Sequence, residues 1–195
     1  LEATGDNKPK IVIEFLDIAS LPELDQALSA RHHDIVHVSG HGAYHQEEKK
    51  GVLYFENADG DEEQISGSAL GETLRRHACV KLLILSACET ATTGGEGGVT
   101  EQVAAYGLPG IIAMRFAVTD EGAKVFTTEF YTKLAGGLSL TRSLAYAREK
   151  LHQTVQLKRE QTPKHPHVAE WFTPVVYQNQ AMGTLIDKTA AYHLP

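Results

Sequence analysis

The chain has 195 residues, of which 42% are hydrophobic and 22% charged, a balance that is ordinary for one soluble globular domain spanning residues 1–195. Its formal net charge of −7 argues against sequence-independent nucleic-acid binding, which needs a basic surface. No apolar run approaches the roughly 20 residues that a membrane span needs, and the first residues lack the layout of a signal peptide. Two cysteines imply no disulfide framework, so we expect a cytoplasmic protein. Because the chain does not begin with Met, we expect it to be part of a longer protein.

Strand and helix signals alternate along the chain and predict an α/β fold with a mostly parallel central sheet and helices on both faces. In the first half we expect a strand at 11–15, a helix opened by Ser20 and Pro22, a strand at 35–38, a β-hairpin over 51–65 and a helix over 68–77. In the second half we expect strands at 81–86 and 111–114, a helix over 100–106, two helices carrying Phe126 and Leu144, a loop over 158–167 and an edge strand at 171–177 that contains Pro174.

Two short segments carry the chemistry, and each follows an apolar run that reads as a buried strand. The first, residues 37–42, reads His-Val-Ser-Gly-His-Gly, and the second, residues 85–90, reads Leu-Ser-Ala-Cys-Glu-Thr. His41 and Cys88 are therefore expected just past the carboxyl ends of two strands, where ligand and catalytic groups gather in a parallel sheet. A thiolate is the nucleophilic form of cysteine, and a neighbouring imidazole is the usual means of producing it. The pairing predicts a cysteine hydrolase.

Each of these residues also has an alternative explanation. A lone cysteine is more often a small core residue, as we expect for Cys79, but Cys88 lies in a turn that runs into a Gly-rich loop. His41 is flanked by Gly40 and Gly42, which we expect to let the backbone turn and a substrate approach closely. The amides of Gly42 and Cys88 could together form an oxyanion hole.

A metal site is a further alternative. Histidines at 37, 41 and 45 are four residues apart, but that spacing aligns ligands only on a helix, and the glycines and the strand pattern argue against one. Cys88 could still join His41 at a zinc ion. We expect no metal and no cofactor.

The two motifs, followed by Met-Arg-Phe-Ala-Val-Thr-Asp at 114–120, resemble those of the CHAT peptidases, which are caspase-like proteins of the clan that also holds separase, gingipain and the caspases. The resemblance covers roughly residues 11–177. It implies a caspase–haemoglobinase-like three-layer sandwich, a His41–Cys88 dyad, and an oxyanion hole made by the amides of Gly42 and Cys88. It also implies regulation by a fused domain or a partner protein.

The resemblance further implies a substrate pocket. Ser86 matches the position that helps to floor the S1 pocket in caspases, and residues 115–120, among them Arg115, Phe116 and Asp120, are expected to wall it. Where separase carries an acidic residue that holds a P1 arginine, this chain has Lys124, so a mildly acidic or uncharged P1 residue fits at least as well.

These observations favour a cysteine endopeptidase that cleaves a protein substrate. A catalytically silent scaffold or regulatory binding module of the same fold is the alternative from another class, and an intact His–Cys pair flanked by glycines argues against it. A cysteine amidase for small molecules is a third possibility, and the long loop after Cys88 suits a polypeptide groove better than a closed pocket.

Overall fold

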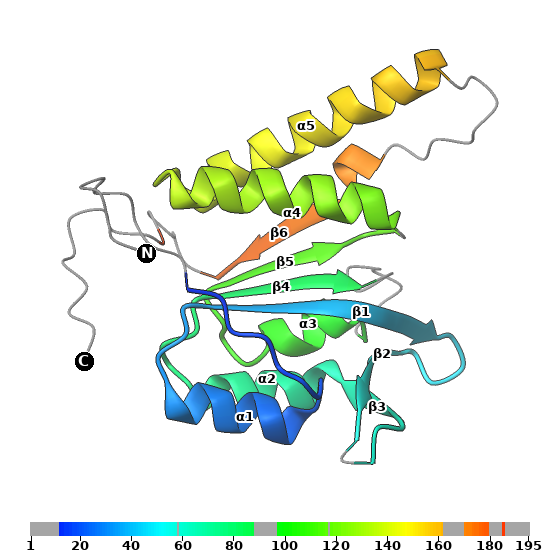
Figure 1. The fold of residues 1–195 in the computed structure, drawn as a ribbon. Coiled ribbons are helices and arrows are strands. Elements are labelled where there is room, and N and C mark those ends of the chain that lie inside the picture. The colour runs from blue at the N-terminus through cyan, green and yellow to red at the C-terminus, as the bar shows by residue number, and fades with distance from the viewer. Residues whose placement is uncertain are drawn as a thin grey trace.

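The fold is a six-stranded sheet between two layers of helices (Figure 1). The computed structural model describes residues 12–57, 59–87, 97–116, 118–161 and 170–179, together with Leu185. Its strands are β1 (Ile35–His45), β2 (Lys50–Glu56), β3 (Glu62–Ser66), β4 (Leu82–Ala87), β5 (Gly110–Met114) and β6 (Pro174–Gln178). Its helices are α1 (Leu21–Ala30), α2 (Gly67–Arg75), α3 (Val99–Ala104), α4 (Asp120–Ala135), α5 (Leu140–Gln161) and the 3₁₀ turn η1 (Glu170–Phe172).

The sheet has the strand order β3-β2-β1-β4-β5-β6. Its three central strands, β1, β4 and β5, are parallel, as the alternation of strand and helix predicts. The outer pairings of β2 with β1, of β3 with β2 and of β6 with β5 are antiparallel. Since β1, β4 and β5 run in one direction, their carboxyl ends lie at the same edge of the sheet.

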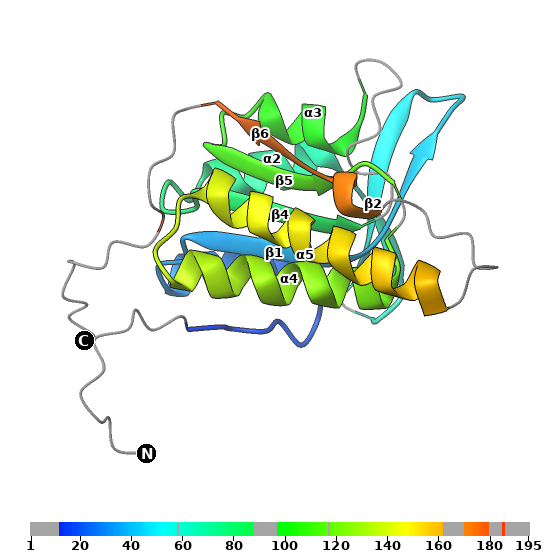
Figure 2. The ribbon, with the colours of Figure 1, turned by 90° about the horizontal axis from the view of Figure 1, so that it is seen from above.

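Helices cover both faces of the sheet, and each face has its own hydrophobic core. One core lies under α1, α2 and α3 and includes Val36, Leu83 and Leu85. The other lies under α4 and α5, which lie side by side over the opposite face of the sheet (Figure 2). There Phe126 and the other apolar residues of α4 pack on Leu82 and Ile84 of β4. The recurrence of apolar residues every three or four positions in α4 and α5 therefore marks their buried sides, as predicted.

Capping residues fix where the helices begin and end. Ser20 caps α1 by accepting a hydrogen bond from the backbone N–H of Glu23 at 3.2 Å, which confirms the predicted start. The cap of α2 is Ser66, which accepts from the N–H of Ala69 at 3.1 Å, so the helix begins at Gly67, one residue before the predicted start. Gly107 has a φ of +80° just after α3, a conformation that costs glycine little and ends the helix.

The predicted first strand is wrong for the part of it that the structure describes. Residues 12–16 are extended but pair with no strand among the described residues, and Val12, Ile13 and Phe15 are exposed. Glu14 instead contacts the region after α1, where its carboxylate lies 3.0 Å from Nε2 of His33. The apolar pattern is that of a strand, but a strand forms only where a neighbour supplies hydrogen bonds. Ile11 lies outside the described residues.

The predicted end of β1 at residue 38 is also wrong. The strand continues to His45 because its second half pairs with β2, from His41↔Tyr54 to His45↔Lys50. The backbone does not turn sharply at Gly40, since the positive-φ glycines of the described residues are Gly60, Gly107 and Gly137.

Near the C-terminus, one prediction is wrong in its bounds and another is confirmed. Helix α5 continues to Gln161, past the start of the loop that we expected at 158. Strand β6 begins at Pro174 and lies at an edge of the sheet, as a proline in a strand predicts. Arg148 of α5 donates from Nε to the carbonyl oxygen of Pro174 at 2.8 Å and holds the start of this edge strand.

Candidate active site

A pocket of about 280 Å³ opens at the edge of the sheet where the parallel strands end. Strands β1, β4 and β5 each contribute to it, and so does the connection from β5 to α4. Its lining residues are Ser39, Gly40, His41, Ser86, Ala87, Met114, Val118 and Asp120. The edge formed by the carboxyl ends of parallel strands is where such folds usually place a binding site. The pocket thus brings both sequence motifs to one place.

His41 reaches the pocket from the middle of β1. Side chains alternate along a strand, so His37, Ser39 and His41 lie on the same face of the sheet. His41 is exposed and pairs across the antiparallel ladder with Tyr54 of β2. Among the described residues, no hydrogen bond holds its imidazole, so the ring is open to the pocket.

The second motif reaches the pocket through the end of β4. Ser86 and Ala87 line it, and Ala87 pairs with Gly40 at the last step of the parallel ladder between β1 and β4. Cys88 follows Ala87 in the chain but lies outside the described residues, as do all positions up to 96. The described part of the site is therefore His41 and the strand end that precedes the cysteine.

A hydrogen-bonded chain of side chains lies behind the pocket. Nε2 of His37 is 2.8 Å from Oγ of Ser86, and Nδ1 of the same ring is 3.2 Å from the hydroxyl of Tyr131 on α4. Burial lowers the pKa of His37 to about 4, from an ordinary value of 6.5, because the charged ring loses its hydration. Burial likewise raises the pKa of Tyr131 to about 12. Both side chains are therefore neutral at pH 7.

The remaining wall of the pocket comes from β5 and the start of α4. Met114 and Val118 are apolar, and Asp120, the first residue of α4, is exposed. Lys124 is also exposed and follows Asp120 by four residues, on the same side of the helix.

Arg115 and Phe116, which the sequence also suggested for the pocket wall, do not line this pocket. The backbone N–H of Arg115 donates to the carbonyl oxygen of Thr173 at 2.9 Å, next to β6. The ring of Phe116 is 46% exposed and packs edge-to-face on Phe172, with 5.7 Å between the ring centroids. Both residues lie on the β6 side of the site.

The far end of the segment that follows Cys88 is attached to the β1–β2 hairpin. The carbonyl oxygen of Gly97 accepts from the backbone N–H of Gly51 at 2.6 Å and from the side-chain amide of Gln102 at 2.7 Å. A side chain at position 97 would collide with the backbone, because its Cβ would lie 1.8 Å from the carbonyl oxygen of Lys49. Only glycine fits this close approach.

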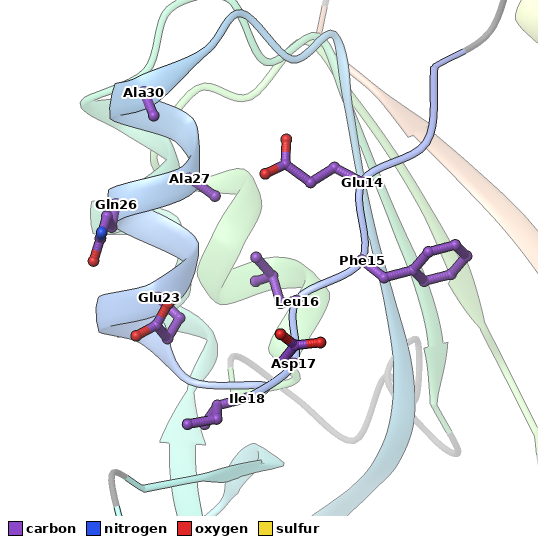
Figure 3. Close-up of a pocket in the computed structure, with 9 residues that line it drawn as sticks. All are labelled: Glu14, Phe15, Leu16, Asp17, Ile18, Glu23, Gln26, Ala27 and Ala30. Carbon is purple, nitrogen blue, oxygen red and sulfur yellow. The ribbon is translucent and has the colours of Figure 1, made fainter.

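A larger pocket, of about 420 Å³, lies between the extended residues 14–18 and helix α1 (Figure 3). Leu16 points toward the helix in this view, whereas Phe15 points away from it. No predicted catalytic or substrate-binding residue lines this pocket. It lies away from the edge of the sheet that carries His41, so we do not take it as the candidate active site despite its larger volume.

The described residues offer neither a metal site nor a membrane-spanning helix. The described residues contain no group of three or more His, Cys, Asp or Glu side chains placed to hold a metal ion. Within the same residues, no helix combines the length and the apolar character needed to cross a bilayer.

Of the residues that line the pocket, the sequence motifs single out His41, Ser86 and Asp120 as candidates, but they give no sign of the partners of His37. The sequence suggests His37 only as a possible metal ligand, although its position two and four residues before Ser39 and His41 places it on the pocket face of the strand. Tyr131, which is 94 residues away in the chain, carried no signal of its own, because its place in α4 matches the apolar pattern of the helix.

Comparison with protein families identifies the CHAT domain, which matches residues 3–179. A search of curated proteins finds no match to the chain. The matched residues span the whole sheet and every side chain that lines the pocket. By the extent of this match, the chain belongs to the CHAT domain family, a caspase-like family.

Proposed function

We propose that this CHAT domain is a cysteine endopeptidase of caspase–haemoglobinase fold, with Cys88 as nucleophile and His41 as general acid and base. The observation that supports it most is the pocket, which is lined by His41 from β1 and by Ser86 and Ala87, the two residues that precede Cys88. The family match adds to this, because the family is caspase-like. The parallel pairing Gly40↔Ala87 brings the two motifs to the same level of the sheet.

The proposed reaction begins with the Cys88 thiolate, which attacks the scissile carbonyl carbon while His41 holds the proton. The carbon–sulfur bond forms, and the carbonyl electron pair moves onto oxygen. His41 then donates its proton to the leaving amine as the peptide bond breaks, which leaves a thioester. His41 next takes a proton from water, whose oxygen attacks the thioester and releases the acid and the thiolate.

Backbone amides of Gly42 and Cys88 are the proposed donors to the oxyanion. Among the described residues, the ladder between β1 and β4 ends at Gly40↔Ala87, so at Gly42 the edge of β1 that faces β4 has no strand partner there. An amide free of a ladder bond is available to a substrate oxygen. The lack of a side chain at Gly42 also leaves room for the scissile bond.

The pocket itself is the proposed binding site for the P1 side chain of a protein substrate. Ser39, His41, Ser86 and Asp120 supply its polar groups, and Met114 and Val118 supply its apolar walls. Arg115 and Phe116 lie toward β6 and would contact substrate residues beyond P1. We also propose that a fused domain or a partner protein regulates cleavage.

The test is cleavage of a proteome-derived peptide library by wild type and by Cys88→Ala, with mass spectrometric detection of new termini. Cys79→Ala is the matched control, since Cys79 is the chain's other cysteine and packs against the core beneath α1–α3. We expect cleavage by wild type and Cys79→Ala and none by Cys88→Ala. Equal cleavage by Cys88→Ala would contradict the proposal. Absence of cleavage by every variant would favour a silent binding module.

A further inference from the structure

The hydrogen-bonded chain from Tyr131 through His37 to Ser86 has no part in the proposed reaction. It starts on α4, crosses β1 and ends on β4, at a hydroxyl that lines the pocket. His37 lies four residues before His41 on the same strand face, one layer deeper than the pocket. In such a series of hydrogen bonds, the direction of one bond determines which group donates in the next.

The number of available protons determines which group donates in each of these two hydrogen bonds. The hydroxyl of Tyr131 has one proton to place, and Nδ1 of His37 is its hydrogen-bond partner among the described residues. If Tyr131 donates to Nδ1, the ring proton of the neutral imidazole is on Nε2 and points at Oγ of Ser86. The opposite tautomer would leave the phenol proton of Tyr131 without an acceptor there, which is costly for a part-buried group.

The hydroxyl of Ser86 then accepts a hydrogen bond from His37 and cannot donate to it. Its oxygen accepts from Nε2 of His37 at 2.8 Å, and His37 is its side-chain partner in the described part of the chain. Because that partner already donates, the proton of Ser86 is left to point toward the pocket that the residue lines. A protonated His37 would also donate from Nε2, so the direction at Ser86 does not depend on the charge of the ring.

Besides Ser86, the pocket is lined by the polar side chains of Ser39 and His41, which lie on β1, and of Asp120. Asp120 is an acceptor at the exposed start of α4, on the side of the pocket away from β1 and β4. Between Asp120 and Ser86 the walls are apolar, formed by Met114 and Val118. A donor at one end and an acceptor at the other suit an uncharged side chain that ends in a carbonyl-like oxygen.

We propose that His37 and Tyr131 are positioning residues that turn the Ser86 hydroxyl into a hydrogen-bond donor facing the pocket, so that the pocket selects an uncharged P1 side chain ending in an acceptor oxygen, as glutamine does. This inference rests on the proposed peptidase function for its substrate, but the proton arrangement stands apart from it. It can therefore be tested in two independent ways.

The first test locates the ring proton of His37. Long-range proton–nitrogen correlation spectra of the whole chain, labelled with ¹⁵N-histidine, show which imidazole nitrogen is protonated, and His37→Gln assigns the signal. We expect the proton on Nε2 at pH 7. A proton on Nδ1 would overturn the inference, since Ser86 would then donate to His37. This readout needs no catalytic activity.

The second test reads the pocket with fluorogenic peptides that differ only at P1. Norleucine offers no hydrogen-bonding group, methionine sulfoxide offers an acceptor only, and glutamine offers both an acceptor and a donor, while all three have similar length. We expect wild type to prefer methionine sulfoxide and glutamine over norleucine by about 3- to 10-fold in kcat/KM, the range that one hydrogen bond gives.

Tyr131→Phe should reduce that ratio while norleucine is still cleaved, because Nδ1 of His37 loses the donor that keeps the ring proton on Nε2, and Ser86 can then also donate to His37. Tyr146→Phe is the matched control, because Tyr146 lies on α5, is 40% exposed and makes no contact in this chain of hydrogen bonds. If Tyr131 were only structural, all substrates would slow equally and the ratio would remain.

The outcomes separate the two proposals. A norleucine peptide cleaved better than the methionine sulfoxide peptide by wild type would overturn the inference and leave the proposed peptidase function intact. Cleavage of none of the peptides, by any variant, would count against the peptidase, and the nitrogen spectra would still decide the direction of the hydrogen bonds.

Discussion

The two faces of the central sheet differ at the level where the parallel strands end. Under α1, α2 and α3 the strand residues stay apolar to the last position, with Leu85 and Ala87 of β4 both in the core. Under α4 and α5 the strands begin with equally buried residues such as Ile84, but the next positions outward are His37 and Ser86. In β1 and β4 the change from apolar to polar therefore occurs on the face where the pocket opens, whereas β5 stays apolar there up to Met114.

Because of this difference, one side of a strand stabilises the fold while the other side contributes to the pocket. Neighbouring residues of β4 point to opposite faces, so one can hold the fold while the next serves the site. A buried polar group is tolerated only when it is hydrogen-bonded, and His37 meets that condition through Ser86 and Tyr131. The polar side chains on this face are therefore explained by the pocket, because packing alone would favour apolar residues there.

The largest expected effect is on the reaction. His41→Ala should lower kcat/KM by about 10²- to 10⁴-fold, because it removes the proposed acid and base. His32→Ala is the matched control, since His32 is exposed and precedes the same strand. Peptide hydrolysis at pH 7 measures both variants. Equal activity of His41→Ala and wild type would contradict the proposed role of His41 as general acid and base.

A pair of neighbouring substitutions tests the two faces directly. Leu85→Ala should lower the free energy of unfolding by about 2–5 kcal/mol, because it opens a cavity in the core under α1–α3. Ser86→Ala should cost about 1–3 kcal/mol, the effect of leaving His37 without its partner. Urea denaturation gives both values. Only Ser86→Ala should also change the P1 preference, and a change caused by Leu85→Ala instead would break the comparison.

Acid should lower the free energy of unfolding because His37 becomes protonated. The pKa of His37 is about 4 in the folded protein, whereas an unperturbed histidine, as in the unfolded chain, has a pKa of 6.5. Between these two pH values the unfolded chain therefore binds more protons than the folded one. The stabilisation is fully present above pH 6.5 and is lost as the pH falls toward 4, by about 3 kcal/mol.

His37→Gln, which does not titrate but can still donate to Ser86, should show a shallower loss of stability across this pH range than wild type. Urea denaturation at several pH values from 7 to 4 measures the difference. His32→Gln, at an exposed histidine, should follow the wild-type curve. Parallel curves for His37→Gln and wild type would mean that His37 is protonated without cost and lies in a more hydrated environment.

The smallest expected effect is at the rim of the pocket. Asp120→Asn should lower the kcat/KM of a lysine P1 peptide relative to a glutamine one by about 2- to 5-fold, since an exposed charge is screened by water. Rates at low and high salt measure this, and salt should reduce the ratio for wild type only. A loss of all activity in Asp120→Asn would indicate a catalytic role that the geometry does not suggest.

Local patterns predicted the elements whose information is local. The apolar run of β4, the spacing of Phe126 and its neighbours in α4, and the cap at Ser20 are each readable within a few residues, and the structure confirms them. The apolar residues at 12–15 gave the same kind of signal but no strand, because pairing requires a distant neighbour. The extension of β1 was missed for the same reason, since β2 provides it.

The site divides in the same way. His41 and Ser86 could be chosen from motifs, whereas their common pocket depends on the register Gly40↔Ala87 between two strands far apart in the chain. His37 could not be assigned a role, because its partners are 49 and 94 residues away. A hydrogen-bonded chain across three elements leaves no periodic mark in the sequence.

The most direct test of the proposed chemistry is to find which residue a peptidyl acyloxymethyl ketone modifies in the wild-type protein. The adduct would be mapped by digestion and mass spectrometry, with glutamine, arginine and norleucine compared at P1. We predict a thioether on Cys88, formed fastest with glutamine and abolished by His41→Ala. Modification of Cys79, or equal modification of both cysteines regardless of the peptide, would contradict a catalytic pair at this edge of the sheet.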